Sequence, residues 1–197
     1  MHQFWDQRYA ENKTVYGEVP NAFFKAFIDQ QKPGTLLLPA EGEGRNAIYA
    51  AERGWTVEAF DFSPVAREKA LAKAAAKGVK IRYDLQDISL FKASKQYDMV
   101  ALLYVHLPEQ LRRAFHTAIY KSIKPGGFLV FEAFAKEQIA FNSGGPKDPA
   151  MLYDAPSICQ DFPFLHQLSC EQKEIVLDEG PFHQGKAAVL RLAGQRL

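Results

Sequence analysis

The stretch from Thr35 to Pro64, TLLLPAEGEGRNAIYAAERGWTVEAFDFSP, constrains the fold of this chain more than any other. It begins with an apolar run, Leu36–Leu38, that has the length of a buried parallel strand. A turn containing Gly42 and Gly44 comes next, then a helical pattern, then a second apolar run that ends on Asp61. Strand, glycine turn, helix, strand and terminal acid form the first half of a nucleotide-binding α/β sheet.

The residue types of this stretch suit a ligand that contains a ribose. Gly42 and Gly44 let the backbone approach a ligand closely, although a tight turn alone would also use them. Asp61 offers a carboxylate that can accept two hydrogen bonds from a ribose diol, while the helix N-terminus faces the polar end of the ligand. Phe62 is expected either along an adenine ring or in the core.

Two ligand classes fit this stretch. The run from Gly42 to Ala47 satisfies the dinucleotide fingerprint in its G-x-G-x-x-A form, with Asp61 a little closer than the usual ~20 residues. The same run is also similar to the first motif of enzymes that bind S-adenosyl-L-methionine. The residues after Pro64 must therefore distinguish the two classes.

Length and composition indicate one ordinary globular domain. The chain has 197 residues, 47% of them apolar and 24% charged, and a net charge of +1 gives no basis for a nucleic-acid surface. Cys159 and Cys170 lack metal-type spacing, so no metal site is expected and both are expected to be reduced thiols. Without a leader-like or membrane-spanning apolar run, we expect a cytoplasmic protein with no membrane partner.

The rest of the chain continues an alternating pattern of strands and helices. Helices are predicted at about Pro20–Gln31, from Ser63 to Gly78 and at Pro108–Ile123, and strands at Val79–Tyr83, Tyr97–Tyr104 and Phe128–Phe134. Two more strands, near Leu165–Leu177 and Ala187–Leu192, have no helix between them and should form an antiparallel hairpin.

The expected fold is therefore a single-domain, Rossmann-like, doubly wound α/β sheet. It has seven mostly parallel strands, a C-terminal antiparallel hairpin and an N-terminal helical cap. Residues 1–33 would form the cap, 34–135 the cofactor-binding core, 136–156 a lid-like loop and 157–197 the hairpin region. The loop lacks sustained periodicity, so we expect it and the N-terminal residues to be mobile covers with few buried contacts.

The carboxyl ends of the strands should carry the chemistry, because ligands bind there in open α/β sheets. Leu103 and His106 come after the fourth strand, and His106 is a candidate general base unless the backbone satisfies its ring. If the sixth strand runs parallel to the first five, the hairpin turn brings His183 to the same edge. An exposed loop histidine is the alternative.

The downstream order resembles that of class I S-adenosylmethionine-dependent methyltransferases. Nearly the whole chain takes part, and YGEVPN, GEGRNA, the HLP after the fourth strand and KPGGFLVFEAF look like the tellurite-resistance and thiopurine-methyltransferase-like branch. The resemblance implies S-adenosyl-L-methionine as the cofactor. It also implies that Asp87 and Ile88 contact the adenine and that Arg8 binds the methionine carboxylate. Trp5 is expected either to pack against the protein or to contact the ligand. Arg45 is expected either to reach a carboxylate or to remain solvated.

One departure from the family pattern concerns the first strand. The family usually has an acid near its end and a glycine that opens the turn, whereas this chain has Leu38 and Ala40. The missing acid normally helps to hold the amino-acid end of the ligand. Either Glu41 takes over that role, or binding is weaker, or this cofactor does not bind.

The expected function is methyl transfer to a small-molecule acceptor, such as a thiol or a chalcogen oxyanion, by in-line displacement. Such a reaction depends on alignment, and a soft nucleophile needs little help from a base. A non-catalytic binding protein and a nicotinamide-dependent reductase are the alternatives.

Overall fold

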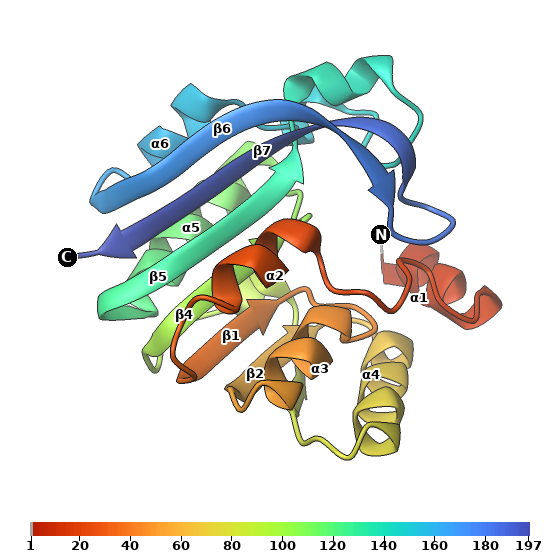
Figure 1. Cartoon of the computed structure of the whole chain (residues 1–197). Coiled ribbons are helices and arrows are strands. Elements are labelled where there is room, and N and C mark those ends of the chain that lie inside the picture. Colours follow the sequence, from red (N-terminus) through yellow and green to blue (C-terminus); the bar gives the residue numbers. More distant parts are fainter. Residues whose placement is uncertain (1) are drawn as a thin grey trace.

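A computed structural model describes residues 2–197, with side chains from Phe4 onward. The seven strands form one sheet in the order β3-β2-β1-β4-β5-β7-β6 (Figure 1). Their bounds are β1 Thr35–Pro39, β2 Thr56–Asp61, β3 Arg82–Leu85, β4 Tyr97–Leu103, β5 Ile123–Phe134, β6 Leu165–Asp178 and β7 Gln184–Arg196.

The strand directions confirm the predicted fold class. Strands β1 to β5 pair in parallel, and β7 is antiparallel to both β5 and β6. Strand β6 therefore runs parallel to the first five, and the turn between β6 and β7 emerges at their carboxyl edge.

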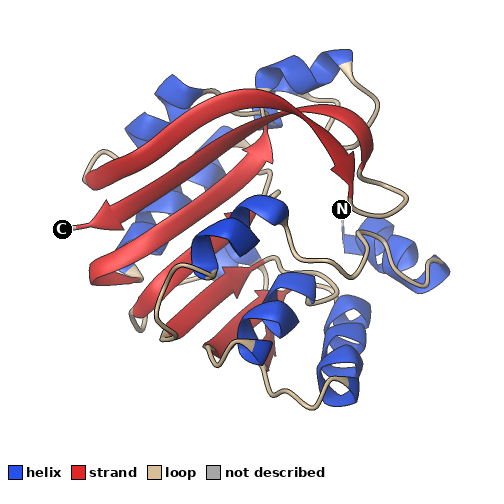
Figure 2. Cartoon of the chain, viewed as in Figure 1, coloured by secondary structure: helices blue, strands red, loops and turns tan. Residues whose placement is uncertain are grey.

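Helices cover both faces of the sheet (Figures 1 and 2). One face carries α2, α3 and α4, whose apolar side chains share a core with β1, β2 and β4. The other face carries α5 and α6, which share a second core with β4, β5 and β7. The helix bounds are α2 Ala22–Ile28, α3 Arg45–Glu52, α4 Pro64–Ala76, α5 Glu109–Lys121 and α6 Ala155–Asp161.

Local signals explain where the helices begin. The side chain of Asn21 accepts a hydrogen bond from the Phe24 amide and caps α2. Ser63 caps α4 in the same way, with Pro64 in the first turn. These positions agree with the predicted starts to within about two residues, which is the usual precision of a helix boundary.

Three expectations about element boundaries were wrong. Strand β3 begins at Arg82 instead of Val79, and β5 begins at Ile123 because the KPGG segment continues the strand. The stretch 136–156 holds two 3₁₀ helices, η2 Lys136–Ala140 and η3 Pro149–Met151, and the start of α6. The predicted loop is therefore largely structured.

The two expected covers are fastened by buried side chains, contrary to the prediction of few buried contacts. In the N-terminal cap, α1 (His2–Glu11) packs on α4 at the carboxyl edge, and Tyr9 and Val15 are buried there. In the second segment, buried Ser143 donates a hydrogen bond to the Lys186 carbonyl, at an Oγ to O distance of 2.6 Å.

Residues 2–197 contain neither a membrane-crossing helix nor a metal-binding cluster. None of the helices described there has the length and apolar character needed to cross a membrane. Within the same range, no group of three or more His, Cys, Asp or Glu side chains could hold a metal ion.

Candidate functional site

Two residues with positive φ mark the carboxyl edge of the sheet. Ala40 comes after β1 with φ 51°, and Tyr104 comes after the neighbouring strand β4 with φ 56°. These are the non-glycine residues with positive φ in the described chain, and such backbone strain concentrates at functional sites. Ala40 thus adopts the left-handed conformation that glycine tolerates best.

The glycine turn and Asp61 are joined directly. The Gly42 amide donates to Asp61 Oδ2 at 3.1 Å, and the Ser63 amide donates to Oδ1 at 2.9 Å. Burial raises the pKa of Asp61, and these backbone bonds oppose the shift. The structure therefore brings the predicted ribose acid against the turn.

Gly42 is also required by packing. A Cβ atom at Gly42 would lie 2.7 Å from the Tyr9 hydroxyl oxygen of the cap, and the residue has φ 61°. The Tyr83 hydroxyl donates to the Gly42 carbonyl at 2.6 Å. Gly44 has φ 83°, and its missing side chain makes room for Ala70 of α4.

Glu41 turns toward helix α3. Its Oε1 accepts hydrogen bonds from the amides of Asn46 and Ala47, both at 2.8 Å, and Oε2 accepts from the Asn46 side chain. Burial raises the pKa of Glu41 to about 7, against the effect of these bonds. This geometry gives Glu41 a structural role, and its role at the cofactor stays a prediction.

Glu43 fastens the cap to the glycine turn. It is buried, and its Oε2 accepts a hydrogen bond from the Val15 amide at 2.7 Å. Lys69 of α4 lies 3.2 Å from Glu43 Oε1 and also donates to the carbonyls of Tyr9 and Asn12. The sequence contained no signal for these long-range bonds.

A cluster of aromatic rings surrounds Arg8 and Trp5, the two residues of the N-terminal cap that were expected to contact the ligand or, for Trp5, to pack. The Arg8 guanidinium lies 4.4 Å from the Phe4 ring centroid, 5.0 Å from that of Trp5 and 4.5 Å from that of Phe182 in the β6–β7 turn. The Trp5 ring also stacks on Tyr9. These contacts join the cap to the hairpin and hold Arg8 at the carboxyl edge.

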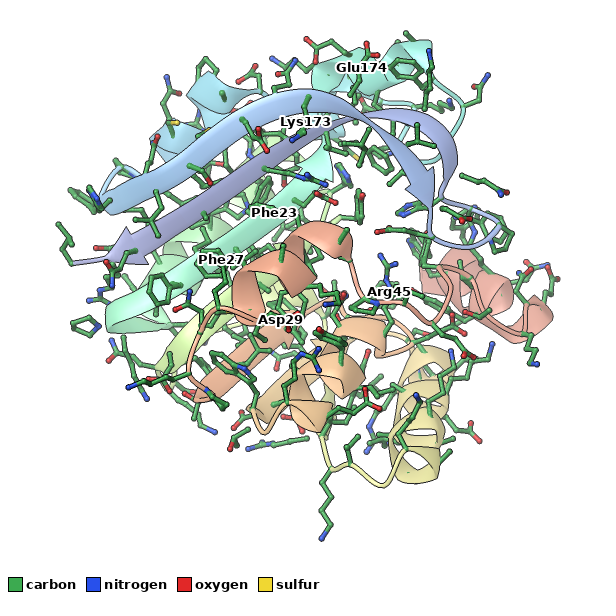
Figure 3. The ribbon with its side chains drawn as sticks, viewed as in Figure 1. Phe23, Phe27, Asp29, Arg45, Lys173 and Glu174 are labelled. Atoms are coloured by element: carbon green, nitrogen blue, oxygen red, sulfur yellow. The ribbon has the colours of Figure 1, made fainter. Side chains whose placement is uncertain are left out.

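Arg45 bridges three segments. Its Nη1 donates to the carbonyls of Tyr16 and Val19, and its Nη2 lies 2.8 Å from Glu179 Oε2 in the hairpin turn. Figure 3 shows Arg45 at the start of α3, beside the segment that links α1 to α2. The guanidinium is therefore occupied by protein partners.

The residues expected near an adenine lie after β2 and β3 at this edge, and Leu103, expected at the same edge, is the last residue of β4. Phe62 is half-buried after β2, and Leu103 ends β4 against the core beneath α2 to α4. Asp87 accepts a hydrogen bond from the Ser89 amide at 2.7 Å and so caps η1 (Ile88–Leu90). Ile88 packs against the opposite core, as Ala40 also does. Their cofactor roles stay predictions.

His106 uses both ring nitrogens on backbone groups. Its Nδ1 lies 2.8 Å from the Met151 carbonyl, and its Nε2 accepts from the Phe134 amide at 3.3 Å. Burial lowers the pKa of His106 to about 4. The arrangement matches the alternative of a histidine satisfied by backbone and does not favour a general base.

His183 lies at the carboxyl edge, as the topology predicted, and it is buried. Its ring centroid is 4.4 Å from that of Tyr16, 4.5 Å from Tyr104 and 5.2 Å from Phe134. Its Nδ1 lies 3.3 Å from Glu179 Oε2. The alternative of an exposed loop histidine is therefore wrong.

Sequence reasoning missed a buried polar network beside His183. Glu132 on β5 accepts hydrogen bonds from Asn21 at 2.5 Å and from the Tyr104 hydroxyl at 2.8 Å, and it pairs with Arg191. An acid within the apolar run of β5 was the available signal, since a carboxylate buried there needs partners.

Comparison with known proteins identifies the kind of domain that carries this edge. Residues 39–127 match the family model of a methyltransferase domain. The matched region, less than half of the chain, is therefore similar to a methyltransferase domain. The match confirms the resemblance to class I methyltransferases and S-adenosyl-L-methionine as the cofactor of the domain's family.

One curated relative extends the comparison. The chain is 31% identical over 127 residues to a 2-heptyl-1-hydroxyquinolin-4(1H)-one methyltransferase of Mycobacteroides abscessus. The match covers 60% of this chain and 55% of that protein, so it spans about half the length of the relative.

Solved structures show the same fold at low identity. TehB from Haemophilus influenzae aligns with a TM-score of 0.77 at 13% identity, covering 100% of this chain and 67% of TehB. The N-methyltransferase NodS from Bradyrhizobium japonicum, solved with S-adenosyl-L-homocysteine, aligns with a TM-score of 0.73 at 16% identity, covering 99% and 97% of the two chains. These likenesses show that the chain shares the fold of both proteins.

Proposed function

We propose that this protein is an S-adenosylmethionine-dependent methyltransferase that acts on a small molecule. The methyltransferase domain match and the small-molecule acceptor named for the relative support the proposal. The observation that carries it is the shared edge, where the Gly42–Asp61 contact and His183 lie on the carboxyl side of the parallel strands. The proposal includes one domain over residues 1–197 and a cytoplasmic location.

The residues at this edge fit the cofactor in the chemistry of its parts. Asp61 would accept from the ribose hydroxyls, Asp87 from the adenine amino group, and Phe62 and Ile88 would contact the adenine ring. Arg8 would face the methionine carboxylate. When bound, the cofactor supplies an activated methyl group on a sulfonium with a good leaving group.

The protein's own contribution is alignment, water exclusion and proton removal. Well-aligned reactants save about 7–11 kcal/mol of barrier. The rings of Tyr16, Tyr104 and Phe134 around His183 suit a planar acceptor. A thiol or chalcogen oxyanion would need little base assistance, whereas a hydroxyl such as the one in the relative's named substrate would give its proton to His183.

A non-catalytic binding protein is a second candidate. Leu38 is buried in the core, and Glu41 is bound to α3, so no β1 carboxylate reaches toward the amino-acid end of a ligand. This candidate predicts cofactor binding without turnover.

Calorimetric titration with S-adenosylmethionine, S-adenosylhomocysteine and NADH tests the proposal first. Radiolabelled methyl transfer is then measured with 2-heptyl-1-hydroxyquinolin-4(1H)-one, thiophenol and tellurite as acceptors. Binding of S-adenosylhomocysteine together with transfer to one acceptor supports the proposal. Binding without transfer favours the non-catalytic candidate, and binding of NADH alone would establish a nicotinamide-linked protein.

A further inference from the structure

Three ionisable side chains meet between the glycine turn after β1 and the hairpin turn between β6 and β7. Arg45 begins α3 next to Gly44, and its Nη2 lies 2.8 Å from Glu179 Oε2. The same carboxylate oxygen lies 3.3 Å from His183 Nδ1. The side chains of Arg45, Glu179 and His183 are only 10%, 12% and 6% exposed, so solvent screens their interactions weakly.

The hairpin turn that carries Glu179 and His183 is rigidly closed. The Glu179 amide donates to the His183 carbonyl at 2.9 Å, and the His183 amide donates to the Gly180 carbonyl at 3.2 Å. Gly180 has φ 82°, and a Cβ there would lie 2.5 Å from the Gly17 nitrogen. The cap therefore clamps the turn and fixes the two side chains relative to each other.

The two nitrogens of His183 have different surroundings. A carboxylate can only accept, so Nδ1 carries the proton that points at Glu179. Among the side chains from Phe4 onward, none forms a hydrogen bond with Nε2, which lies beside Gly144. A Cβ at Gly144 would lie 2.7 Å from the adjacent Cδ2, so glycine is what allows this segment to pack closely beside the Nε2 side of the ring. His106 differs, because backbone groups occupy both of its nitrogens.

We propose that Glu179 is the positioning residue of His183, holding the proton on Nδ1 so that Nε2 removes the acceptor's proton. Arg45 holds Glu179 in place and links the Glu179–His183 pair to the glycine turn. The inference rests on the proposed function. In the step, the acceptor X–H proton moves to Nε2, the X–CH3 bond forms, and the S–CH3 bond breaks with its electron pair left on sulfur.

The ionised Glu179 stabilises the imidazolium that results, as carboxylate–histidine pairs do in other active sites. Other titratable groups also face His183 from the elements packed around it. These are Arg45, Glu132, Tyr16, Tyr104 and His106.

The test is the tautomer and titration of His183 in the full chain labelled with nitrogen-15. Long-range nitrogen–proton spectra distinguish a protonated ring nitrogen from an unprotonated one. The His183 signal is assigned by its loss in His183→Gln, and contacts with the Tyr16 ring give the same assignment if that variant does not fold. We expect the Nδ1–H tautomer in the wild type. In Glu179→Gln, we expect a titration midpoint lower by roughly one pH unit, because an attractive charge is lost.

Glu174→Gln is the matched control, since Glu174 is exposed on the outer strand β6 (Figure 3) and should leave both properties unchanged. An Nε2–H tautomer in the wild type, or no change in Glu179→Gln, would overturn the proposal. These readouts need no turnover, so failure of the proposed function appears separately as absent S-adenosylhomocysteine binding. With an accepted substrate, Glu179→Gln should also lower kcat about 10–100-fold.

Discussion

At the scale of single residues, the proposed contact between Asp61 and the cofactor's ribose can be tested directly. We expect Asp61→Asn to weaken S-adenosylhomocysteine binding by roughly 1.5–3 kcal/mol per lost bond at most, because an amide replaces a charged acceptor. Calorimetric titration measures the change. Asp84→Asn, at a half-exposed acid of β3 that pairs with Arg82, is the control. Equal affinity of Asp61→Asn and the wild type would rule out the ribose contact.

Glu41 should make stability depend on pH. Its pKa is near 4.5 when unfolded and about 7 when folded, so the folded state holds the proton more tightly. Its contribution to stability is present below about pH 4.5 and is lost as the pH rises through about 7. Glu41→Gln removes this dependence. The unfolding free energy of the variant minus that of the wild type should therefore increase by roughly 3 kcal/mol between pH 5 and pH 8. Denaturant unfolding of both proteins at the two pH values measures this change. If Glu41 titrated normally, the difference in unfolding free energy between variant and wild type would be the same at both pH values.

At the scale of elements, the attachment of the cap to α4 depends on Lys69. Its ammonium donates to the Tyr9 and Asn12 carbonyls and pairs with Glu43. We expect Lys69→Met to speed amide exchange at least tenfold in residues 9–15, because local opening becomes easier, with no change in β1 or β4.

Lys73→Met provides the comparison for this experiment. Lys73 lies one turn along the same helix, and its Nζ is 3.7 Å from Glu43, beyond hydrogen-bonding distance. Equal exchange in the two variants would show that Lys69 does not fasten the cap.

Adding S-adenosylhomocysteine to the wild type should slow amide exchange in residues 4–19 and 140–150 if these segments cover the cofactor.

At the scale of the whole molecule, shared cores join the cap, the sheet and the hairpin. Trp5 packs in the cap and Trp55 in the core beneath α2 to α4. We therefore expect one cooperative unfolding transition. In the Trp55→Phe variant, tryptophan fluorescence reports on Trp5 in the cap, and its unfolding midpoint should coincide with the midpoint measured by far-ultraviolet circular dichroism. An earlier fluorescence transition would make the cap a separate unit.

The sequence by itself determined the order and type of most elements and the position of the glycine turn between β1 and α3. Strand and helix periodicity, the Ser63 cap and the glycines are local signals, and local signals can be recognised without knowledge of the fold. The position of His183 at the carboxyl edge could also be predicted, because a hairpin fixes strand direction.

The tertiary structure alone decided which partners the long polar side chains take. Glu43 binds the Val15 amide of the cap, 28 residues away, and Arg45 reaches Glu179, which lies 134 residues away. Nothing near these residues in the sequence specifies such bonds, since a flexible charged side chain pairs with whatever the packed chain brings within about 3 Å. For the same reason, folding separated two similar histidines, giving His106 two backbone partners and leaving one nitrogen of His183 beside Gly144.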